Sequence, residues 1–254
     1  MHTRRLYFVA LLLCTVNVYW YLSVTRLSAE LTEKLGRSSM SALIDQRLQV
    51  QQEGLKRQQQ QQQLSALKTL YQAASTSTER RLYGDPKARI TLRLFGDIEC
   101  PYCRQIHPEL KQVVDNAGGL INWEYKHFPL SNHNPAAAIA AQAVECIAEI
   151  HDNQSAWIAL GAFIGSTKGN GAGIGDLIGT SRALGLNGSL IGLCLHSDAH
   201  KTAINNDYQE GRNLMISATP AIVMIDNLTT NQQILKGYLP AAQLLALVQK
   251  FLKE

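Results

Sequence analysis

The sequence predicts an α/β domain that follows an apolar N-terminal helix and a helical stalk. Three observations support this order. An uncharged apolar run occupies Leu6–Val24, a glutamine-rich stretch without proline occupies residues 26–80, and a strand–helix–strand pattern begins at Arg89. Turn-rich residues at 74–78 and 83–88 separate stalk from domain. The expected parts are a head and anchor at 1–25, a stalk or linker at 26–83 and a folded domain at 84–254.

The apolar run Leu6–Val24 predicts an uncleaved, single-pass membrane anchor. It approaches the roughly 20 residues that a helix needs to cross a bilayer, whereas the core of a cleaved signal has roughly 7 to 15. The aromatic residues 19–21 suit the far membrane interface. Arg4 and Arg5 favour a cytoplasmic N-terminus, so the chain after residue 25 would be exported. A removed signal peptide is the alternative.

Residues 26–80 predict a helical stalk because they are rich in good helix formers such as glutamine, leucine and lysine. Leu27, Leu31 and Leu35 repeat at helical spacing, but the apolar positions over residues 43–55 do not keep a strict heptad. A semi-rigid spacer is therefore favoured over an oligomerisation stalk. A homo-oligomer formed through the stalk stays open.

Composition excludes one class of partner. The 254 residues have a formal net charge of +4 without a block of lysine and arginine, so no nucleic-acid partner is expected. Of the 5 cysteines, Cys14 lies in the apolar run. The remaining even set, Cys100, Cys103, Cys146 and Cys194, suits an oxidising compartment but also occurs by chance.

The folded domain opens with a strand, a cysteine motif and a helix. Residues 89–95 and 120–128 predict strands, and residues 104–119 predict a helix kinked at Pro108. The motif Cys-Pro-Tyr-Cys at 100–103 therefore lies where a strand turns into a helix.

This position predicts a redox-active dithiol. A helix N-terminus has unpaired N–H groups and about half a positive charge, which stabilise a thiolate at Cys100. Pro101 suits the first helical turn because it has no N–H group to leave unpaired. Cys103 lies one turn further along, near enough to form a disulfide and more buried. Cys100 is the predicted nucleophile, and Cys103 would resolve the mixed disulfide.

Other interpretations of the cysteines fit less well. Haem attachment needs a histidine after the second cysteine, and an arginine follows it here. A four-cysteine zinc site needs a second close pair, whereas Cys146 and Cys194 stand apart. Cys194, His196 and His200 could hold a metal, but solvent-facing histidines are commoner, so no metal is expected. The glycine-rich run 167–176 matches no phosphate-binding pattern and favours a flexible loop.

Four features follow one another in a specific order after residue 84. They are FGDIECPYC, WEYKHFPLSNHNPAAAIAAQAVECIAE, SATPAIVMID and a C-terminal amphipathic helix. Together they resemble the DsbA-type thioredoxin-fold thiol–disulfide oxidoreductases over roughly residues 84–254. The resemblance implies a thioredoxin fold with a helical domain inserted at about 131–215.

The resemblance also implies which residues bind substrate. The Thr219–Pro220 bond would be cis and would face the dithiol, so that Thr219, Pro220, Pro101 and Tyr102 contact the substrate. A cis-proline turns the preceding backbone toward an incoming peptide, which can then pair like an added strand. An ordinary edge-strand start is the alternative for Pro220.

Some members have a non-catalytic disulfide in the insertion, so the resemblance implies that Cys146 and Cys194 pair. Two buried free thiols are the alternative. The resemblance further places the catalytic domain in the periplasm of a Gram-negative bacterium, with Leu6–Val24 in the inner membrane.

The sequence departs from the family pattern at two points. Members often have a buried glutamate six residues before the first cysteine, and Leu94 stands there. Asp97, Glu99 and Lys126 are candidates for the missing proton-transfer group. The dipeptide is Pro-Tyr rather than Pro-His. A less oxidising couple is therefore expected, between about −120 mV and about −270 mV.

The sequence thus predicts a periplasmic thiol–disulfide oxidoreductase that exchanges disulfides with cysteine-containing exported proteins through Cys100 and Cys103. It needs no bound cofactor, because electrons pass by exchange with a membrane redox partner protein. A monomer on a spacer would donate disulfides, whereas an oligomer would act as an isomerase or reductase. A binding or assembly factor with a regulatory dithiol is an alternative of another class.

Overall fold

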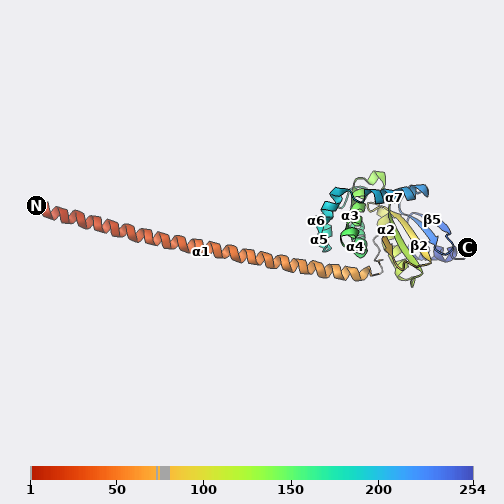
Figure 1. Cartoon of the computed structure of the whole chain (residues 1–254), viewed down its shortest axis with the longest axis horizontal. Coiled ribbons are helices and arrows are strands. Elements are labelled where there is room, and N and C mark those ends of the chain that lie inside the picture. The colour runs from red at the N-terminus through yellow and green to blue at the C-terminus, as the bar shows by residue number, and fades with distance from the viewer. Residues whose placement is uncertain (1, 73, 75–80, 254) are drawn as a thin grey trace. The chain divides into compact units, whose positions relative to one another are not determined.

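The chain divides into two compact units. The structure, a computed structural model, describes residues 2–72, 74 and 81–253, with side chains from residue 18 onward except at 37, 38 and 63. One unit is Met1–Gln58 and the other is Gln59–Glu254. Helix α1 (His2–Leu70) contributes residues to both units, and the other elements belong to the second (Figure 1).

Residues 2–58 of the first unit belong to α1, and the predicted stalk is helical from residue 26 to Leu70. Residues 81–83 at its predicted end form strand β1 instead, and residues 73 and 75–80 lie outside the described part of the chain. Among the described residues, no helix has a segment that is both long and apolar enough to cross a membrane. The predicted anchor Leu6–Val24 has helical backbone, but its side chains up to residue 17 lie outside the described part of the chain. The anchor therefore stays a prediction.

A five-stranded sheet forms the centre of the second unit, in the order β1-β3-β2-β4-β5. Its strands are β1 (Arg81–Tyr83), β2 (Ile90–Gly96), β3 (Ile121–His127), β4 (Ala221–Asp226) and β5 (Gln232–Lys236). Strands β2 and β3 lie within one residue of their predicted positions and run parallel, whereas the other neighbouring pairs run antiparallel. The C-terminal ends of β2 and β3 therefore meet at one edge of the sheet.

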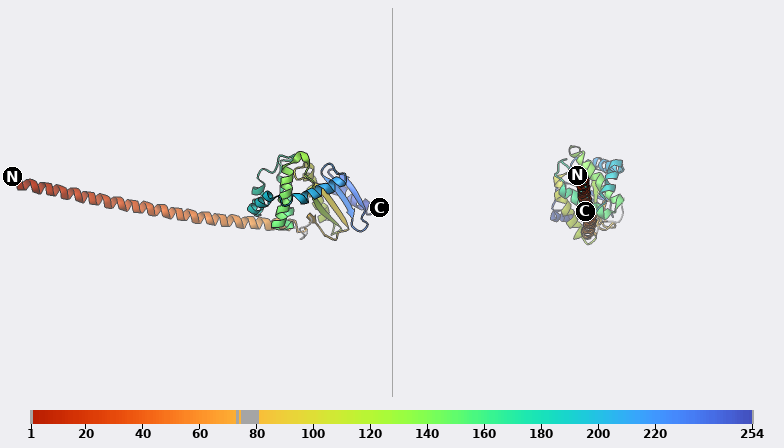
Figure 2. Two further views of the ribbon diagram at one scale, coloured as in Figure 1. Left: turned by 45° about the horizontal axis from the view of Figure 1, so that its top comes forward. Right: turned by 90° about the vertical axis from the view of Figure 1, so that its left-hand side faces the viewer.

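Helices cover both faces of this sheet (Figure 2). Helices α2 (Pro101–Asp115) and α8 (Ala241–Phe251) pack on the face formed by Leu92, Leu94 and Met224. On the other face, the ring of Phe128 stacks on Tyr208 with centroids 4.6 Å apart. Between β3 and β4 the chain forms η1 (Ser131–His133), α3 (Ala136–Ile150), α4 (Asn153–Ser166), α5 (Leu177–Ala183), α6 (Gly188–Ser197) and α7 (Lys201–Asn213). These helices occupy the range expected for the insertion.

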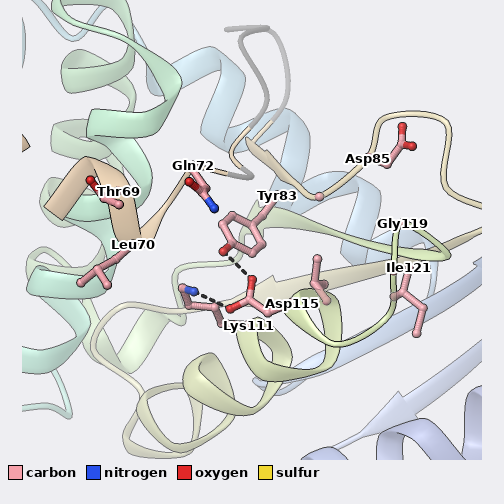
Figure 3. Close-up of a pocket in the computed structure, with 12 residues that line it drawn as sticks. Thr69, Leu70, Gln72, Tyr83, Asp85, Lys111, Asp115, Gly119 and Ile121 are labelled. Atoms are coloured by element: carbon pink, nitrogen blue, oxygen red, sulfur yellow. Dashed lines mark hydrogen bonds and ion pairs between the residues drawn. The ribbon is translucent and has the colours of Figure 1, made fainter. Parts of the chain in front are cut away.

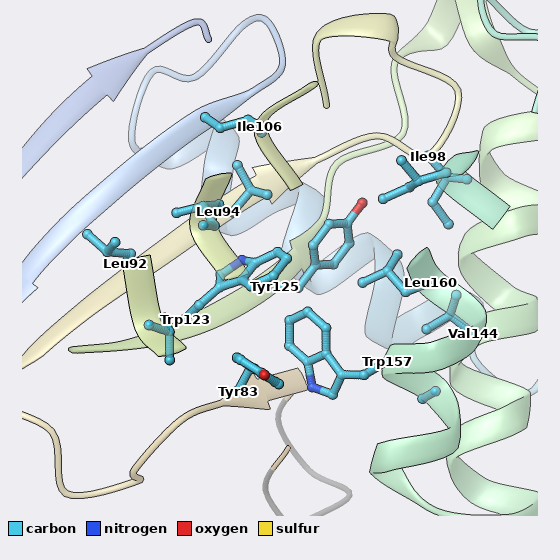
Figure 4. Close-up of a cluster of buried hydrophobic side chains, with 14 of the residues drawn as sticks. Tyr83, Leu92, Leu94, Ile98, Ile106, Trp123, Tyr125, Val144, Trp157 and Leu160 are labelled. Carbon is cyan, nitrogen blue, oxygen red and sulfur yellow. The ribbon is translucent and has the colours of Figure 1, made fainter. Parts of the chain in front are cut away.

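One aromatic core joins the insertion to the sheet (Figure 4). Trp157 of α4 meets Trp123 of β3 edge to face, with ring centroids 4.5 Å apart, and both side chains are fully buried. Tyr83 of β1 packs against both tryptophans. Burial of each large aromatic side chain contributes about 2–3 kcal/mol. The insertion and this face of the sheet therefore contribute to one core.

The compact unit begins upstream of Gly84, where the sequence places the start of the domain. Strand β1 ends at Tyr83 and pairs with β3. Before it, Lys68 of α1 forms an ion pair with Asp152 at 2.8 Å, and Gln154 donates to the carbonyl of Lys68 at 2.8 Å. A strand of three residues is too short to show an alternating pattern, so β1 could not be predicted from the sequence. The contacts of Lys68 join residues far apart in the chain, and local sequence patterns do not indicate such contacts.

Candidate active site

The cysteine motif lies at the edge where β2 and β3 end. Cys100 is the N-cap of α2, and Pro101 occupies its first turn. The helix begins earlier than the predicted residue 104 because proline is well suited to a first turn, although the apolar periodicity becomes clear only further along. Cys100 and Cys103 are free thiols that are 5% and 1% exposed, whereas Tyr102 is 59% exposed.

The surroundings of Cys100 favour its thiolate. Its pKa is lowered from 9.0 to about 6, chiefly by a hydrogen bond from the Cys103 thiol, and burial opposes this effect. The Thr219 side chain and the backbone N–H groups of Tyr102 and Cys103 lower the pKa further. Those N–H groups belong to the first turn of α2 and have no carbonyl partner within the helix. Cys100 therefore ionises near neutral pH.

Cys103 behaves in the opposite way. Burial raises its pKa well above 9.0, and the neighbouring Cys100 raises it further. The backbone N–H of Asp97 donates to its sulfur at 3.4 Å. Cys103 therefore stays a thiol while Cys100 is a thiolate, which fits the predicted roles of a buried resolving group and a nucleophile.

The Thr219–Pro220 bond faces this pair. It is cis, and the Thr219 carbonyl accepts a hydrogen bond from the Cys100 thiol at 3.4 Å. The Thr219 hydroxyl is buried near the two sulfurs, where it favours the thiolate form of Cys100. The structure therefore brings Thr219 and Pro220 to the dithiol, beside Pro101 and Tyr102.

Comparison with known proteins assigns the chain to a family. A family model described as thioredoxin matches residues 75–241. DsbA2 from Pseudomonas aeruginosa is 30% identical with a TM-score of 0.61, over 68% of this chain and 94% of that one. This chain belongs to the DsbA-like family of thioredoxin-fold thiol–disulfide oxidoreductases. Oxidised BdbD from Bacillus subtilis, at 18% identity, shares the fold with a TM-score of 0.59 over 72% of this chain and 98% of that one.

Curated relatives match over a short segment. The Na(+)/H(+) antiporter NhaA 1 of Salinispora arenicola is 33% identical over 72 residues, which are 26% of this chain and 11% of that protein. NhaA 1 of Mycolicibacterium gilvum is 37% identical over 63 residues, 25% of this chain and 10% of the antiporter. The DsbA-like chain therefore spans about a tenth of the length of these relatives.

Of the three proton-transfer candidates, Asp97 contacts Cys103, through its backbone N–H group. Its carboxylate is 1% exposed and accepts hydrogen bonds at 2.8 Å from the backbone N–H groups of Leu130 and Glu99. His133 Nδ1 lies 2.8 Å from the same carboxylate. Burial raises the pKa of Asp97. Sequence reasoning missed His133, because its partner is 36 residues away and only the fold joins them.

Glu99, the second proton-transfer candidate, holds the glycine-rich run 167–176 through its carboxylate. Its fully buried carboxylate accepts hydrogen bonds from the Thr167 hydroxyl and, at 2.9 Å, from the Gly173 N–H. The Asn170 N–H donates to the Glu99 carbonyl at 2.8 Å. Gly169 has a φ of 80°, and a Cβ there would contact this same carbonyl. The run is therefore not a free loop as predicted, because a buried carboxylate needs donors and glycine can turn the backbone to supply them.

Lys126, the third candidate, forms its ion pairs with α7 rather than with the dithiol. Its Nζ forms ion pairs with Asp207 at 2.8 Å and with Glu210 at 3.1 Å, both on α7. Leu94, six residues before Cys100, is fully buried in the apolar core. Of the residues considered for proton transfer, Asp97 is therefore the one with a hydrogen bond to Cys103, through its backbone N–H.

The second cysteine pair is joined as the resemblance implies. Cys146 of α3 and Cys194 of α6 form a disulfide. His196, grouped with Cys194 and His200 as a possible metal set, points its Nδ1 to the Gly192 carbonyl at 2.6 Å. Among the described residues, the cluster with metal-ligand spacing is instead Cys146, Cys194 and His200.

A cavity of about 650 Å³ lies at the other end of α2 (Figure 3). Lys111, Asp115 and Tyr83 line it, and the Asp115 carboxylate accepts from Tyr83 at 2.7 Å and from Lys111 at 2.6 Å. The 15 residues of α2 separate it from Cys100 by about 20 Å. This cavity therefore takes no part in the chemistry of the dithiol.

Proposed function

We propose that this DsbA-like protein is a periplasmic oxidoreductase that donates disulfides to exported proteins with cysteines. The opposite pKa shifts of Cys100 and Cys103 support this most strongly. A stabilised Cys100 thiolate favours the reduced form of the enzyme, and a couple whose reduced form is stabilised is a better oxidant. Disulfide donation is therefore the favoured direction.

The reaction follows from these shifts. A substrate thiolate attacks Cys100 Sγ in the oxidised enzyme, the Cys100–Cys103 bond breaks, and Cys103 takes up a proton. A second substrate thiolate then attacks the substrate sulfur of the mixed disulfide. Cys100 leaves as a thiolate, which its pKa of about 6 favours. The substrate loses two electrons, and a membrane redox protein would remove them from the enzyme without a bound cofactor.

Thr219, Pro220, Pro101 and Tyr102 would hold the substrate during exchange. The exposed Tyr102 ring offers apolar contact area beside the sulfur. The buried Thr219 hydroxyl can donate to the thiolate that develops on Cys100, whose pKa it lowers. An extended substrate segment would pair with the backbone before Pro220.

The exported location rests on the sequence and on the second disulfide. The uncharged run Leu6–Val24 would anchor the chain in the inner membrane, and the Cys146–Cys194 bond fits an oxidising compartment. Protease added to spheroplasts should remove the DsbA-like domain. A domain protected until the membrane is lysed would contradict export.

An oligomeric isomerase is the second candidate function. Apolar side chains of α1, including Leu27, Leu31 and Leu35, are 59%, 53% and 65% exposed, and a second copy could cover them. The mass of the full-length protein in detergent distinguishes the candidates. A monomer removes the basis for the isomerase.

Replacing Cys100 by alanine tests whether the protein is an enzyme. Peptide oxidation should stop while the far-ultraviolet circular dichroism spectrum stays unchanged. A full biological effect retained by Cys100→Ala would favour the binding or assembly factor instead.

A further inference from the structure

The second cysteine pair lies beside a histidine and a carboxylate. The sulfurs of Cys146 and Cys194 and one ring nitrogen of His200 all lie within 4.8 Å of one another. His200 Nε2 lies 2.9 Å from Glu149 Oε2. The side chains of His200 and Glu149 are 19% and 63% exposed, so the cluster opens to solvent on this side.

We propose that reduction of the Cys146–Cys194 disulfide converts this cluster into a zinc site. Cys146, Cys194 and His200 would be the protein ligands, and water would occupy the fourth position. Thiolate sulfur and imidazole nitrogen are ligands that Zn²⁺ prefers. With Nε2–H of His200 donating to Glu149, Nδ1 offers its lone pair to the metal. A carboxylate that accepts from the second ring nitrogen is the usual neighbour of a zinc-bound histidine.

The change in geometry is small. Disulfide sulfurs lie about 2.05 Å apart, whereas two tetrahedral Zn–S bonds of about 2.3 Å place the sulfurs about 3.8 Å apart. Each sulfur therefore moves by roughly 0.9 Å, which rotation about the Cα–Cβ bonds can supply. The Cα atoms are 5.9 Å apart. Helices α3 and α6 can thus stay in place, with zinc joining them instead of the S–S bond.

Charge and electrons both balance. A dithiol reductant gives two electrons and two protons to the disulfide and becomes a disulfide itself. Zn²⁺ then displaces the two thiol protons to solvent, while His200 binds as a neutral imidazole. Two thiolates neutralise the ion, so the metal adds no net charge near Cys146, which is 1% exposed.

The test uses the full chain with Cys14, Cys100 and Cys103 replaced by alanine, so that the second pair supplies all thiols. The protein is reduced with dithiothreitol, freed of it under anaerobic conditions, and titrated with Zn²⁺ against a chromophoric chelator. One zinc ion per reduced chain is expected, and none in the oxidised chain. Titration with Co²⁺ should produce thiolate-to-metal charge-transfer absorption.

Variants identify the ligands. His200→Ala should lower zinc affinity at least 10-fold, and Glu149→Gln about 10- to 100-fold. His196→Ala is the matched control and should change nothing, because its ring bonds within α6. Zinc binding by the reduced chain that is no tighter than by the oxidised chain overturns the proposal. Equal losses in His196→Ala and His200→Ala overturn it too, as does a reduced chain that unfolds and does not regain helix when zinc is added.

Discussion

The two cysteine pairs of this chain lie in contrasting surroundings. Cys100 and Cys103 begin one helix at a sheet edge, where unpaired N–H groups and the Thr219–Pro220 segment surround them. Cys146 and Cys194 lie within α3 and α6, where backbone N–H groups already donate along the helix. The first pair can therefore stabilise a thiolate, whereas the second serves as a cross-link. Position on a helix, more than residue type, separates the two roles.

Removing the first pair's nucleophile should have the largest effect. Cys100→Ala should lower the rate of disulfide exchange at least about a thousandfold, because the reaction loses its attacking sulfur. Oxidation of a fluorescent dithiol peptide measures this rate. The double variant Cys146→Ala/Cys194→Ala is the control and should keep most of the activity. Comparable losses in both proteins would erase the distinction between the pairs.

The helix that holds Cys146 should depend on a buried ion pair. Arg81 of β1 contacts Glu145 at 2.8 Å, and these side chains are 6% and 14% exposed. Burial raises the pKa of Glu145, but hydrogen bonds from Arg81 and His127 outweigh it and hold the pKa well below 4.5. Arg81→Met removes the permanently charged partner of this buried carboxylate and leaves it only the His127 ring among the described contacts. The free energy of unfolding should therefore fall by about 3–5 kcal/mol in urea titrations at neutral pH.

The pH dependence of that loss checks its cause. Because the folded-state pKa is depressed, the stabilisation by Glu145 is complete above about 4.5 and disappears as pH falls toward the folded value. Arg81→Met should therefore approach the parent protein in stability as the solution is acidified. Lys201→Met, which breaks an exposed pair with Asp198, is the control and should change stability by about 0–1 kcal/mol. If the loss of unfolding free energy in Arg81→Met did not vary with pH, it would come from lost packing rather than from the ion pair.

Loss of the second disulfide should lower stability without affecting exchange. The bond closes a loop with a sequence separation of 48. Cys146→Ala/Cys194→Ala should therefore lose about 2–4 kcal/mol of unfolding free energy. Thermal unfolding of the oxidised protein measures the loss. An unchanged midpoint would show that the pair has no cross-linking role.

The smallest predicted effect concerns the loop bound to Glu99. Glu99→Gln turns an amide donor toward the Thr167 hydroxyl or the Gly173 N–H, which should cost about 1–3 kcal/mol. The rate of Cys100 alkylation should change only a few fold, because other groups stabilise the Cys100 thiolate. Thr167→Val removes one donor from the same carboxylate and should give a smaller loss of stability. A large change in Cys100 reactivity would make Glu99 part of the first pair's environment.

Sequence reasoning succeeded where local rules determine structure. Alternation of apolar residues predicted β2 and β3, and the family order of motifs led to the cis bond at Thr219–Pro220 and to the pairing of Cys146 with Cys194. The position of the cysteine motif between a strand and a helix was also predicted, although α2 begins at Pro101 rather than at the expected residue 104.

It failed where tertiary contacts determine structure. The glycine-rich run looked free because its partner, Glu99, is 68 residues from Thr167. The contact between His133 and Asp97 likewise forms only when the segment after β3 folds back beside the dithiol. Strand β1 is too short for a pattern, and its pairing with β3 identifies it.

The pH dependence of Cys100 alkylation tests the central claim most directly. The reduced full-length protein, with its Cys146–Cys194 bond intact, is treated briefly with iodoacetamide across a pH series, and modification of Cys100 is followed by peptide mass spectrometry. The rate should rise with a midpoint near pH 6 while Cys103 stays unmodified up to pH 9. A midpoint near the ordinary thiol value of 9.0, or equal labelling of both cysteines, would contradict a thiolate stabilised at the start of α2.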